Sequence, residues 1–461
     1  MGGYSMKGSK TLNMTVGSPI RLLIQFSIPL LIGNLFQQVY GLTDSMIVGQ
    51  FLGANAIASI GATNSVTFLF FSVCNGISSG AGIVTAQFFG GGLENKTKSS
   101  IANSAYIMLA AAIVMGTSAF LAAPNLLQML GTPAEILPDS LIYIRVNCIG
   151  VMLVAVYNYS AEMLRALGDS RTPLYFLICA CLLNVVLDLL FVCVFDMGVF
   201  GAAFATVLAQ MTAGIGCLIY AFKYNSYFNL TKKDLRVDFS VIFQALRIGL
   251  PLALQWSMIA LSITALQRFV NSFGASAMAA YTVTNRIEQL VQMPYKSISS
   301  ALSTYAGQNY GAKNLARVKN GLRHGMLLAV ILSASMLLVF QLLKEPIMGL
   351  FVKEQDVIEI GAKGLSVTSC FYLTLGGIYV SRGILNGVGD AMFAFINGIV
   401  EIGCRFLIPY ILVALFPGVD QTAIWWTSGL TWTIGALFCL TRYFFWNRKT
   451  NRLGLDVKQS T

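Results

Sequence analysis

The chain has 461 residues, of which 56% are hydrophobic and 11% are charged, and its mean hydropathy is +0.71. A soluble domain carries about a quarter charged residues, so this composition excludes an ordinary soluble protein and indicates a polytopic membrane protein. The net charge of +11 does not indicate a nucleic-acid partner. Most lysines and arginines fall in alternate segments between apolar runs, as membrane orientation requires.

Twelve apolar segments are long enough to cross a bilayer, which takes about 20 residues. The spans are expected near 20–48, 56–89, 99–122, 138–165, 172–195, 198–222, 245–272, 277–307, 321–343, 357–386, 391–416 and 421–446. They predict an all-α fold with a cytoplasmic segment 1–19, an N-lobe 20–222, a cytoplasmic linker 223–244, a C-lobe 245–446 and a cytoplasmic tail 447–461. Because the basic segments share a side with the N-terminus, both termini are predicted to be cytoplasmic.

The two halves of the chain repeat each other. The segment FLGANAIASIGATNSV from Phe51 matches SFGASAMAAYTVTNRI from Ser272, and a shift of 221 residues maps Gly53 onto Gly274. Since each half has an even number of spans, both halves enter the membrane from the same side, and the repeat is parallel. The expected architecture is therefore two six-helix lobes around a central cleft, where such proteins typically bind their substrate.

Two acidic residues interrupt apolar spans of the first half, although a charge at the bilayer centre costs about 3 kcal/mol. At 1.5 Å per residue, Asp44 lies about 13 Å and Asp188 about 15 Å from the outer ends of their spans. Tyr40 and Asn184 precede them by one helical turn on the same faces. Thr206 on the sixth span can add a hydroxyl to the same place. The acids are therefore expected to meet at one depth.

Each acid could be a structural pin that hydrogen bonds hold between helices. A switch is the alternative that the matched depth favours. Protonating an ordinary aspartate at pH 7 costs about 4 kcal/mol, which is close to the cost of about 3 kcal/mol for inserting the charged form. The local environment can then decide which form is present. A proton, a sodium ion and a cationic substrate would compete for one site, which is the basis of antiport.

The second half lacks this arrangement, because the shift of 221 replaces Asn184 by Arg405 and Asp188 by Pro409. Glu401 and Arg405, four residues apart, are interpreted as an intrahelical ion pair. The other charges within spans of this half are interpreted as structural as well; they are Arg286, Glu288 and Lys296. In the first half, Glu162 can face the cleft or pair with Arg165 three residues on.

Other classes of function find little support. The single histidine, His324, lies at the edge of a span, so no nucleophile and base are available for an intramembrane enzyme. The glycines at 90–92 lack the Lys-Ser/Thr of a phosphate loop, and the nine cysteines show no metal-binding spacing. Aromatic residues at span ends predict an interfacial belt; they are Trp425, Trp426, Tyr443, Phe444, Phe445 and Trp446.

Several motifs carry a family likeness. They are NLFQQVYGLTDSMIVGQFLGANAIASIG in the first span, GAGIVTAQFFGGG after the second, LRALGDSRTPL after the fourth, LNVVLDLLFV in the fifth, and YAGQNYGAKN and ILNGVGDA in the second half. Over essentially its whole length the chain resembles multidrug and toxic compound extrusion (MATE) transporters. It looks closer to the DinF-like and MepA-like groups than to the NorM branch.

This resemblance implies an antiporter, not an enzyme, in a bacterial cell membrane. It would export cationic amphipathic drugs by alternating access in exchange for H⁺ or Na⁺, with no other cofactor. The resemblance assigns ion coupling to Asp44, Asn184, Asp188 and Thr206, and metal ligation to Asp44, Asn184 and Asp188 if sodium is the ion. It assigns pocket-lining positions to Gln37 and Tyr40 and a hinge to Pro29, and Asn158 and Glu162 are expected to contribute to substrate binding as well.

The chain also departs from the NorM pattern, which uses acids in spans 7 and 10. Span 7 offers Gln255 instead, and span 10 has no acid in its middle, so a second ion site is not expected. A lipid-linked saccharide flippase of the same superfamily is the alternative function, but more basic residues in the cleft and extra spans would be expected of it. The expected partners are small molecules and membrane lipids, without nucleic acid, and the expected state is a monomer.

Overall fold

The computed structural model describes residues 11–416, 418 and 420–452, and in this part of the chain the regular structure is helical throughout. The predicted ends of the chain, 1–10 and 453–461, lie outside the described residues. The helices of the first half are α1 (Pro19–Leu52), α2 (Ala54–Gly90), α3 (Glu94–Met129), α4 (Leu137–Ala166), α5 (Arg171–Asp188), the π-helical segment η1 (Leu189–Val194) and α6 (Gly198–Tyr224). The all-α prediction is confirmed.

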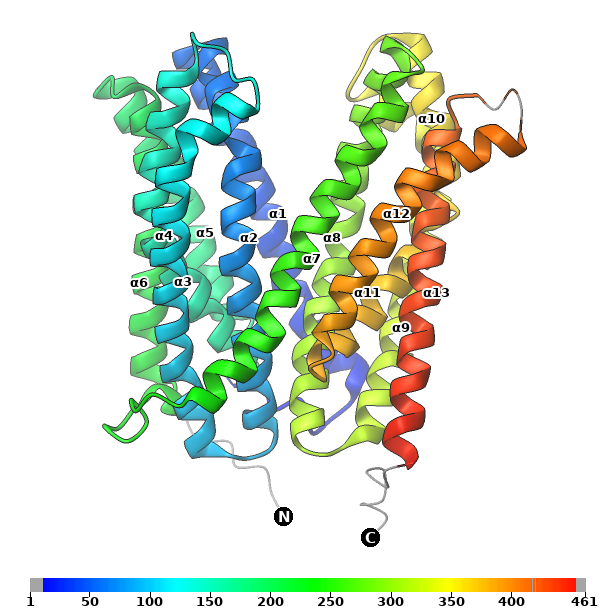
Figure 1. The fold of residues 1–461 in the computed structure, drawn as a ribbon. Helices are drawn as coiled ribbons and strands as arrows, with labels where there is room; N and C mark the ends of the chain where they lie inside the picture. The colour runs from blue at the N-terminus through cyan, green and yellow to red at the C-terminus, as the bar shows by residue number, and fades with distance from the viewer. Residues whose placement is uncertain (1–10, 417, 419, 453–461) are drawn as a thin grey trace. The chain divides into compact units, whose positions relative to one another are not determined.

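The second half begins after a short 3₁₀ turn, η2 (Ser226–Phe228). Its helices are α7 (Phe239–Asn271), α8 (Ala275–Gly311), α9 (Leu315–Gly349), α10 (Gln355–Ser369), α11 (Tyr372–Gly387), α12 (Ala391–Leu415) and α13 (Ala423–Arg452). Figure 1 shows these helices, with the colour running along the chain from blue at the N-terminus to red at the C-terminus.

Ten or eleven of the twelve predicted spans are apolar enough to cross a membrane among the described residues. Ten helices are each long and apolar enough to cross a membrane, and α10 and α11, bent by 51° to each other, form an eleventh span. The remaining predicted span, 277–307, falls on α8, which has 37 residues but carries Arg286, Glu288 and Lys296 and is not apolar enough to count among them. The predicted span 357–386 corresponds to the bent pair, because the chain breaks at Cys370 and Phe371 between α10 and α11.

The internal repeat is confirmed in backbone detail. Helices α2 and α8 each have 37 residues, and their bounds differ by the predicted 221 at both ends. Each follows a glycine with nearly the same conformation, φ 85° and ψ −176° at Gly53 and φ 87° and ψ −177° at Gly274. A positive φ of this kind is open to glycine and strained for other residues, so the repeat preserves a turn that depends on the residue type.

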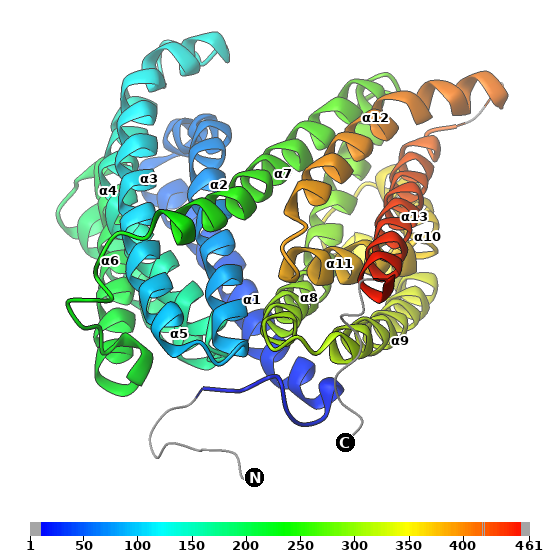
Figure 2. The ribbon, with the colours of Figure 1, turned by 60° about the horizontal axis from the view of Figure 1, so that its bottom comes forward.

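The chain divides into two compact units. Among the described residues, unit 1 contains 11–14 and Ile28–Ala253, whereas unit 2 contains Thr15–Ser27 and the chain from Leu254 to Arg452. Within unit 1, helices α2 to α6 stand side by side, with α4 packed against α2, α3 and α6 (Figure 1). Within unit 2, α11 packs against α8, α9 and α13, as the view in Figure 2 also shows.

Small residues let α2 and the first part of α7 approach closely within unit 1. A Cβ atom added at Gly76 would lie 2.4 Å from the backbone N of Ala253, and one added at Gly80 would lie 2.4 Å from that of Gly249. Spacing of small residues by four along both helices is the usual way for membrane helices to pack backbone against backbone. This contact fixes the start of α7 on unit 1.

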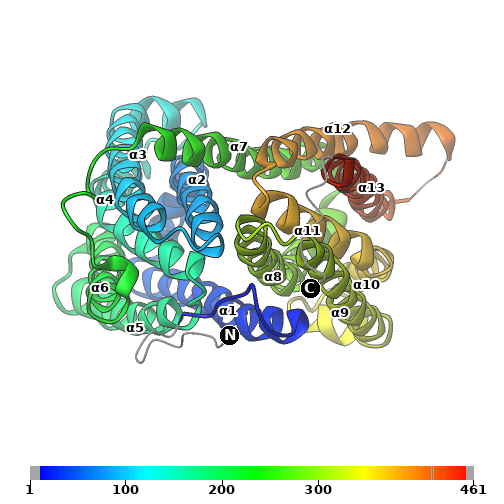
Figure 3. The same cartoon turned by 90° about the horizontal axis from the view of Figure 1, so that it is seen from below.

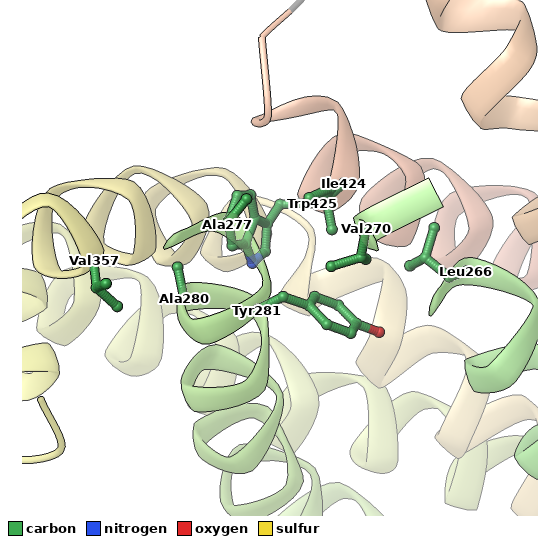
Figure 4. Close-up of a cluster of buried hydrophobic side chains, with 8 residues drawn as sticks. All are labelled: Leu266, Val270, Ala277, Ala280, Tyr281, Val357, Ile424 and Trp425. Carbon is green, nitrogen blue, oxygen red and sulfur yellow. The ribbon is translucent and has the colours of Figure 1, made fainter. Parts of the chain in front are cut away.

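The core of unit 2 at one end of α8 is an apolar cluster around Trp425, drawn in Figure 4 with Tyr281, Leu266 and Val270. Trp425 is only 1% exposed and its indole N–H donates to the Thr284 hydroxyl at 3.0 Å. The prediction of an interfacial belt was therefore wrong for Trp425, and also for Tyr443, which is 4% exposed. The predicted belt is compatible with Trp426, Phe444 and Phe445, whose side chains are 43%, 60% and 60% exposed.

The predicted intrahelical pair of Glu401 with Arg405 was wrong. Glu401 on α12 instead pairs with Arg382 on α11, at 2.7 Å between Oε1 and a guanidinium nitrogen. Asn397 Nδ2 donates to the same Glu401 oxygen at 2.8 Å. Arg382 is 6% exposed and lies inside the bundle of unit 2. A buried charge needs a partner, and the helix next to α12 supplies it.

Candidate functional site

Asp188 lies where the fifth span changes its helical form. It is the last residue of α5, and the π-helical segment η1 begins at the next residue. Asp188 and Asn184, one turn before it, are both 0% exposed. π-helical segments within longer helices are rare and occur frequently at functional sites. Both the charge of Asp188 and the irregular backbone that follows it therefore indicate a functional position.

Asp44 on α1 lies next to Asp188. The two carboxyl groups lie close enough to share a hydrogen bond when one of them is protonated, although they belong to spans far apart in the sequence. Asp44 Oδ1 is buried and has no hydrogen-bond partner among the described residues. A hydrogen bond between two carboxyl groups requires a proton, because two carboxylates offer only acceptors. Two adjacent carboxyl groups can hold one proton between them, because only the protonated one offers a donor.

A polar network supports the pair on one side. The Tyr40 hydroxyl donates to Thr206 Oγ1 at 3.2 Å, and Asn184 Nδ2 donates to the same atom at 3.5 Å. Thr206 thus joins α1, α5 and α6 through one hydroxyl. Of the four residues assigned to ion coupling, Asp44 meets Asp188 directly, and Asn184 meets Thr206.

Two apolar clusters of unit 1 enclose the site. One contains Val48 and Val192, each one helical turn beyond Asp44 and Asp188, together with Ala56, Val199 and Ala202. The other contains Leu177, Cys181 and Ala209 and packs against the Tyr40 ring. Because apolar surroundings strengthen electrostatic interactions, a charge that enters or leaves this site has a large effect on its neighbours.

Tyr143 and Asn147 on α4 belong to this neighbourhood, although the sequence did not single them out. Tyr143 lies within electrostatic range of both Asp44 and Asp188, and Asn147 Nδ2 donates to the Tyr143 carbonyl at 2.9 Å. Their spacing of four residues within an apolar span is the signal that identified Tyr40 with Asp44, so the same rule would have found them.

The residues assigned to substrate binding do not all gather in one place. Gln37 lines a pocket of unit 1 with Asn34, Arg165 and the hinge candidate Pro29, where α1 faces α5 and the end of α4. Tyr40 belongs to the acid site instead. The pocket therefore receives only part of the expected set.

Glu162 and Asn158 lie one turn apart on α4. Glu162 forms an ion pair with Arg165 at 3.2 Å, so of the two possibilities left open for this acid the structure shows the pair. Asn158 Nδ2 donates to Asn75 Oδ1 on α2 at 3.2 Å. Glu162 also packs on Gly82, where an added Cβ would lie 2.8 Å from its side chain.

No group of three His, Cys, Asp or Glu side chains converges on a possible metal site within the described residues. A sodium ion at Asp44 and Asp188 would accordingly need amide and hydroxyl oxygens beside the two carboxylates. Asn184 and Thr206 are the candidates that the network provides.

The family model described as MatE matches the chain twice, over residues 29–190 and 251–411. The two matched segments start 222 residues apart and end 221 apart, in agreement with the repeat. Together they cover more than half of the chain.

Two relatives from Bacillus subtilis (strain 168) match over nearly their whole length. The probable multidrug resistance protein YpnP is 28% identical, covering 95% of this chain and 98% of the relative. The probable multidrug resistance protein YoeA is 27% identical, covering 93% and 94%.

A solved structure described as MATE in the bent conformation has the same fold. Its TM-score is 0.89 at 21% identity, covering 96% of this chain and 98% of that chain. Proteins of this family are membrane transporters rather than enzymes, and they use ion gradients. The chain thus belongs to the MATE family of multidrug efflux transporters.

Proposed function

We propose that this protein exports organic cations in exchange for H⁺ or Na⁺, and that Asp44 and Asp188 couple the two movements. The observation that carries the proposal is the contact between these carboxyl groups, with Asp188 fully buried and one Asp44 oxygen left without a partner. An orphaned buried acceptor is costly, and a proton or a cation satisfies it.

The exchange follows from competition. A proton or sodium ion between the carboxyl groups removes the negative charge that would attract a cationic drug. Binding of a cationic drug favours the ionised form of the carboxyl groups, and the proton or sodium ion is released. The coupling is reciprocal, so the ion must weaken drug binding by the factor by which drug weakens ion binding. Alternating access to the two sides of the membrane then turns this competition into export.

The drug is proposed to contact Gln37 and Tyr40 on α1, with Asn158 and Glu162 on α4 nearby. Gln37 already lines a pocket, and Pro29 lies in the same pocket wall. Pro29 removes a backbone hydrogen bond from α1, which supports its proposed role as the hinge of this helix. Since Arg165 neutralises Glu162, the acid that attracts a cation would be Asp44 or Asp188.

The proposed setting is a bacterial cell membrane with both termini and the linker 223–244 on the cytoplasmic side. Lobes 20–222 and 245–446 are the proposed moving parts. Alternate segments rich in lysine and arginine support this orientation.

Proteoliposomes with one imposed gradient at a time test the function. Uptake of a fluorescent organic cation such as ethidium is measured with a proton gradient alone and then with a sodium gradient alone. Wild type should respond to one gradient, which names the ion, and Asp188→Asn should lose that response while remaining folded.

Asp196→Asn is the matched control, because Asp196 lies a few residues further along the chain, is exposed and has a φ of 51° that asparagine tolerates. The control should transport as wild type does. Normal gradient-driven uptake by Asp188→Asn would refute the coupling role. If neither gradient drives uptake of any cation, anionic and lipid-linked substrates become the next test, as the flippase alternative requires.

A further inference from the structure

The segment 225–238 joins α6 to α7. Both helices are apolar enough to cross the membrane, so the segment between them lies at a membrane surface. Figure 3 shows it in green between the end of α6 and the start of α7. The whole segment and the first part of α7 belong to unit 1.

Side chains of α3 hold this segment in place. Asn103, which is 0% exposed, donates its Nδ2 to the Arg236 carbonyl at 3.2 Å and accepts the backbone N–H of Asp238 at 2.9 Å. The Tyr106 hydroxyl donates to the Leu235 carbonyl at 2.9 Å. Three hydrogen bonds to the backbone therefore fix residues 235–238 against α3. We call the whole connecting segment, residues 225–238, the strap.

The acids of the strap are engaged locally. Asp234 is 7% exposed and accepts the backbone N–H and the hydroxyl of Thr231 at 2.8 and 2.6 Å. These bonds hold the pKa of Asp234 below its usual range. Asp238 accepts the backbone N–H of Ser240 at 2.9 Å at the start of α7, where a carboxylate stabilises a helix. Both negative charges are thus used within the strap.

The bases face outward. Lys232, Lys233 and Arg236 are exposed, and so is Arg247 two turns into α7. Within the part of the chain that the structure describes, no ion pair joins any of the four to an acid. The outer surface of the strap is therefore strongly positive.

Large apolar side chains lie among these bases. Leu235 and Val237 are 46% and 56% exposed, and Phe239 and Phe243 at the start of α7 are 79% and 67% exposed. Phe239, Phe243 and Arg247 follow each other at intervals of four and so share one helix face. Exposed aromatics interleaved with lysine and arginine are typical of surfaces that insert between lipid headgroups.

We propose that the strap and the start of α7 form a binding surface for anionic phospholipid headgroups. Lys232, Lys233 and Arg236 would contact the headgroup phosphates, while Phe239 and Phe243 enter the acyl boundary. Charge complementarity selects this occupant, because the surface carries four exposed bases outside the ion pairs of the described residues and adjoins two helices that are apolar enough to cross the membrane. Each basic residue near an anionic bilayer strengthens binding about fivefold.

The basic residues of the strap could serve only as a signal that orients the protein in the membrane, but such a role does not explain how the strap is built. Orientation during membrane insertion depends on the number of basic residues near a span. It needs neither a strap pinned by buried Asn103 nor acids held inward nor phenylalanines held outward. The three features together expose a fixed positive surface with apolar side chains.

Native mass spectrometry of the purified full-length chain with added phosphatidylglycerol or phosphatidylcholine tests the proposal. The variant Lys232→Gln/Lys233→Gln removes two charges without touching the hydrogen bonds of the strap. Its phosphatidylglycerol affinity should fall about 25-fold, the product of two fivefold losses. The control Lys353→Gln/Lys363→Gln removes two exposed lysines elsewhere and should change the affinity less than twofold.

A second variant, Phe239→Ser/Phe243→Ser, should weaken retention of both lipids. Equal phosphatidylglycerol binding by wild type and by the Lys232→Gln/Lys233→Gln variant would overturn the proposal, as would equal binding of the two lipids by wild type. Soluble glycerol phosphate should not compete. If it displaces phosphatidylglycerol at the same concentration, the surface is a site for free phosphates and the lipid assignment is wrong. These readouts do not depend on which ion drives transport.

Discussion

The carboxyl group of Asp44 on α1 and that of Asp188 on α5 lie close enough to interact directly inside unit 1. Two carboxylates at this range repel each other unless a proton or a cation lies between them. The pair therefore acts as one site, and neither acid can be replaced without changing the charge that the other one meets.

A double-mutant cycle tests this unity. Asp44→Asn and Asp188→Asn should each abolish gradient-driven uptake, and the double variant should be no worse than either, because residues that act as a unit are strongly non-additive. The measurement is the initial rate in proteoliposomes under the driving gradient. Residual rates that multiply, so that the double variant is far slower than each single one, would show two independent sites.

Thr206→Val should separate proton coupling from sodium coupling. Valine keeps the shape of threonine but removes the oxygen that accepts from Tyr40 and Asn184. If the ion is sodium, loss of a ligand oxygen should weaken its binding about tenfold, a penalty of about 1.4 kcal/mol. If the ion is a proton, its half-saturating concentration should change little. Half-saturation of the transport rate by each ion is the measurement, with Thr212→Val on the exposed side of α6 as control.

The acids of unit 1 could be predicted from the sequence because the signal is local. A polar residue within an apolar run is visible without knowing the fold, and its distance from the end of the span gives its depth. The repeat was equally visible, because one offset maps Gly53 onto Gly274 and both residues keep the same backbone conformation.

Partners on other helices were not predictable in this way. Helical spacing proposes only partners on the same helix, such as Arg405 for Glu401, whereas the structure pairs Glu401 with Arg382 across α11 and α12. Trp425 lies near a span end by count, but packing around Tyr281 buries it. The π-helical segment after Asp188 has no local signature, since its backbone is set by packing against α6.

Gly80→Val should destabilise unit 1 by forcing α2 away from α7. The added side chain would start 2.4 Å from the backbone N of Gly249, and overpacking of this kind costs about 1–3 kcal/mol or more. Gly61→Val on the same helix is the control, because an added Cβ there has no atom within 4 Å. Melting temperatures of the two purified variants should differ clearly. Equal melting temperatures would show that the close contact between α2 and α7 does not contribute to the stability of unit 1.

Arg382→Met should be strongly destabilising, by about 3–5 kcal/mol, because it leaves the buried Glu401 charge without its partner. Arg382→Met/Glu401→Gln should recover most of the loss, since glutamine keeps an acceptor for Asn397 without the charge. Thermal unfolding of the purified variants measures both. A double variant as unstable as the single one would show that Arg382 stabilises through its packing rather than through the pair.

The strap should loosen in acid. Because the pKa of Asp234 is lowered by the bonds from Thr231, its contribution is fully present above the unfolded value of about 3.9. It is lost as pH falls through the lower, folded value. Amide hydrogen exchange in 231–236, corrected for its intrinsic pH dependence, should therefore stay slow near neutrality and accelerate below about pH 4. Asp234→Ala should exchange fast at every pH. Slow exchange in this variant at neutral pH would mean that Asn103 and Tyr106 alone hold the strap, and phosphatidylglycerol binding should then be unchanged as well.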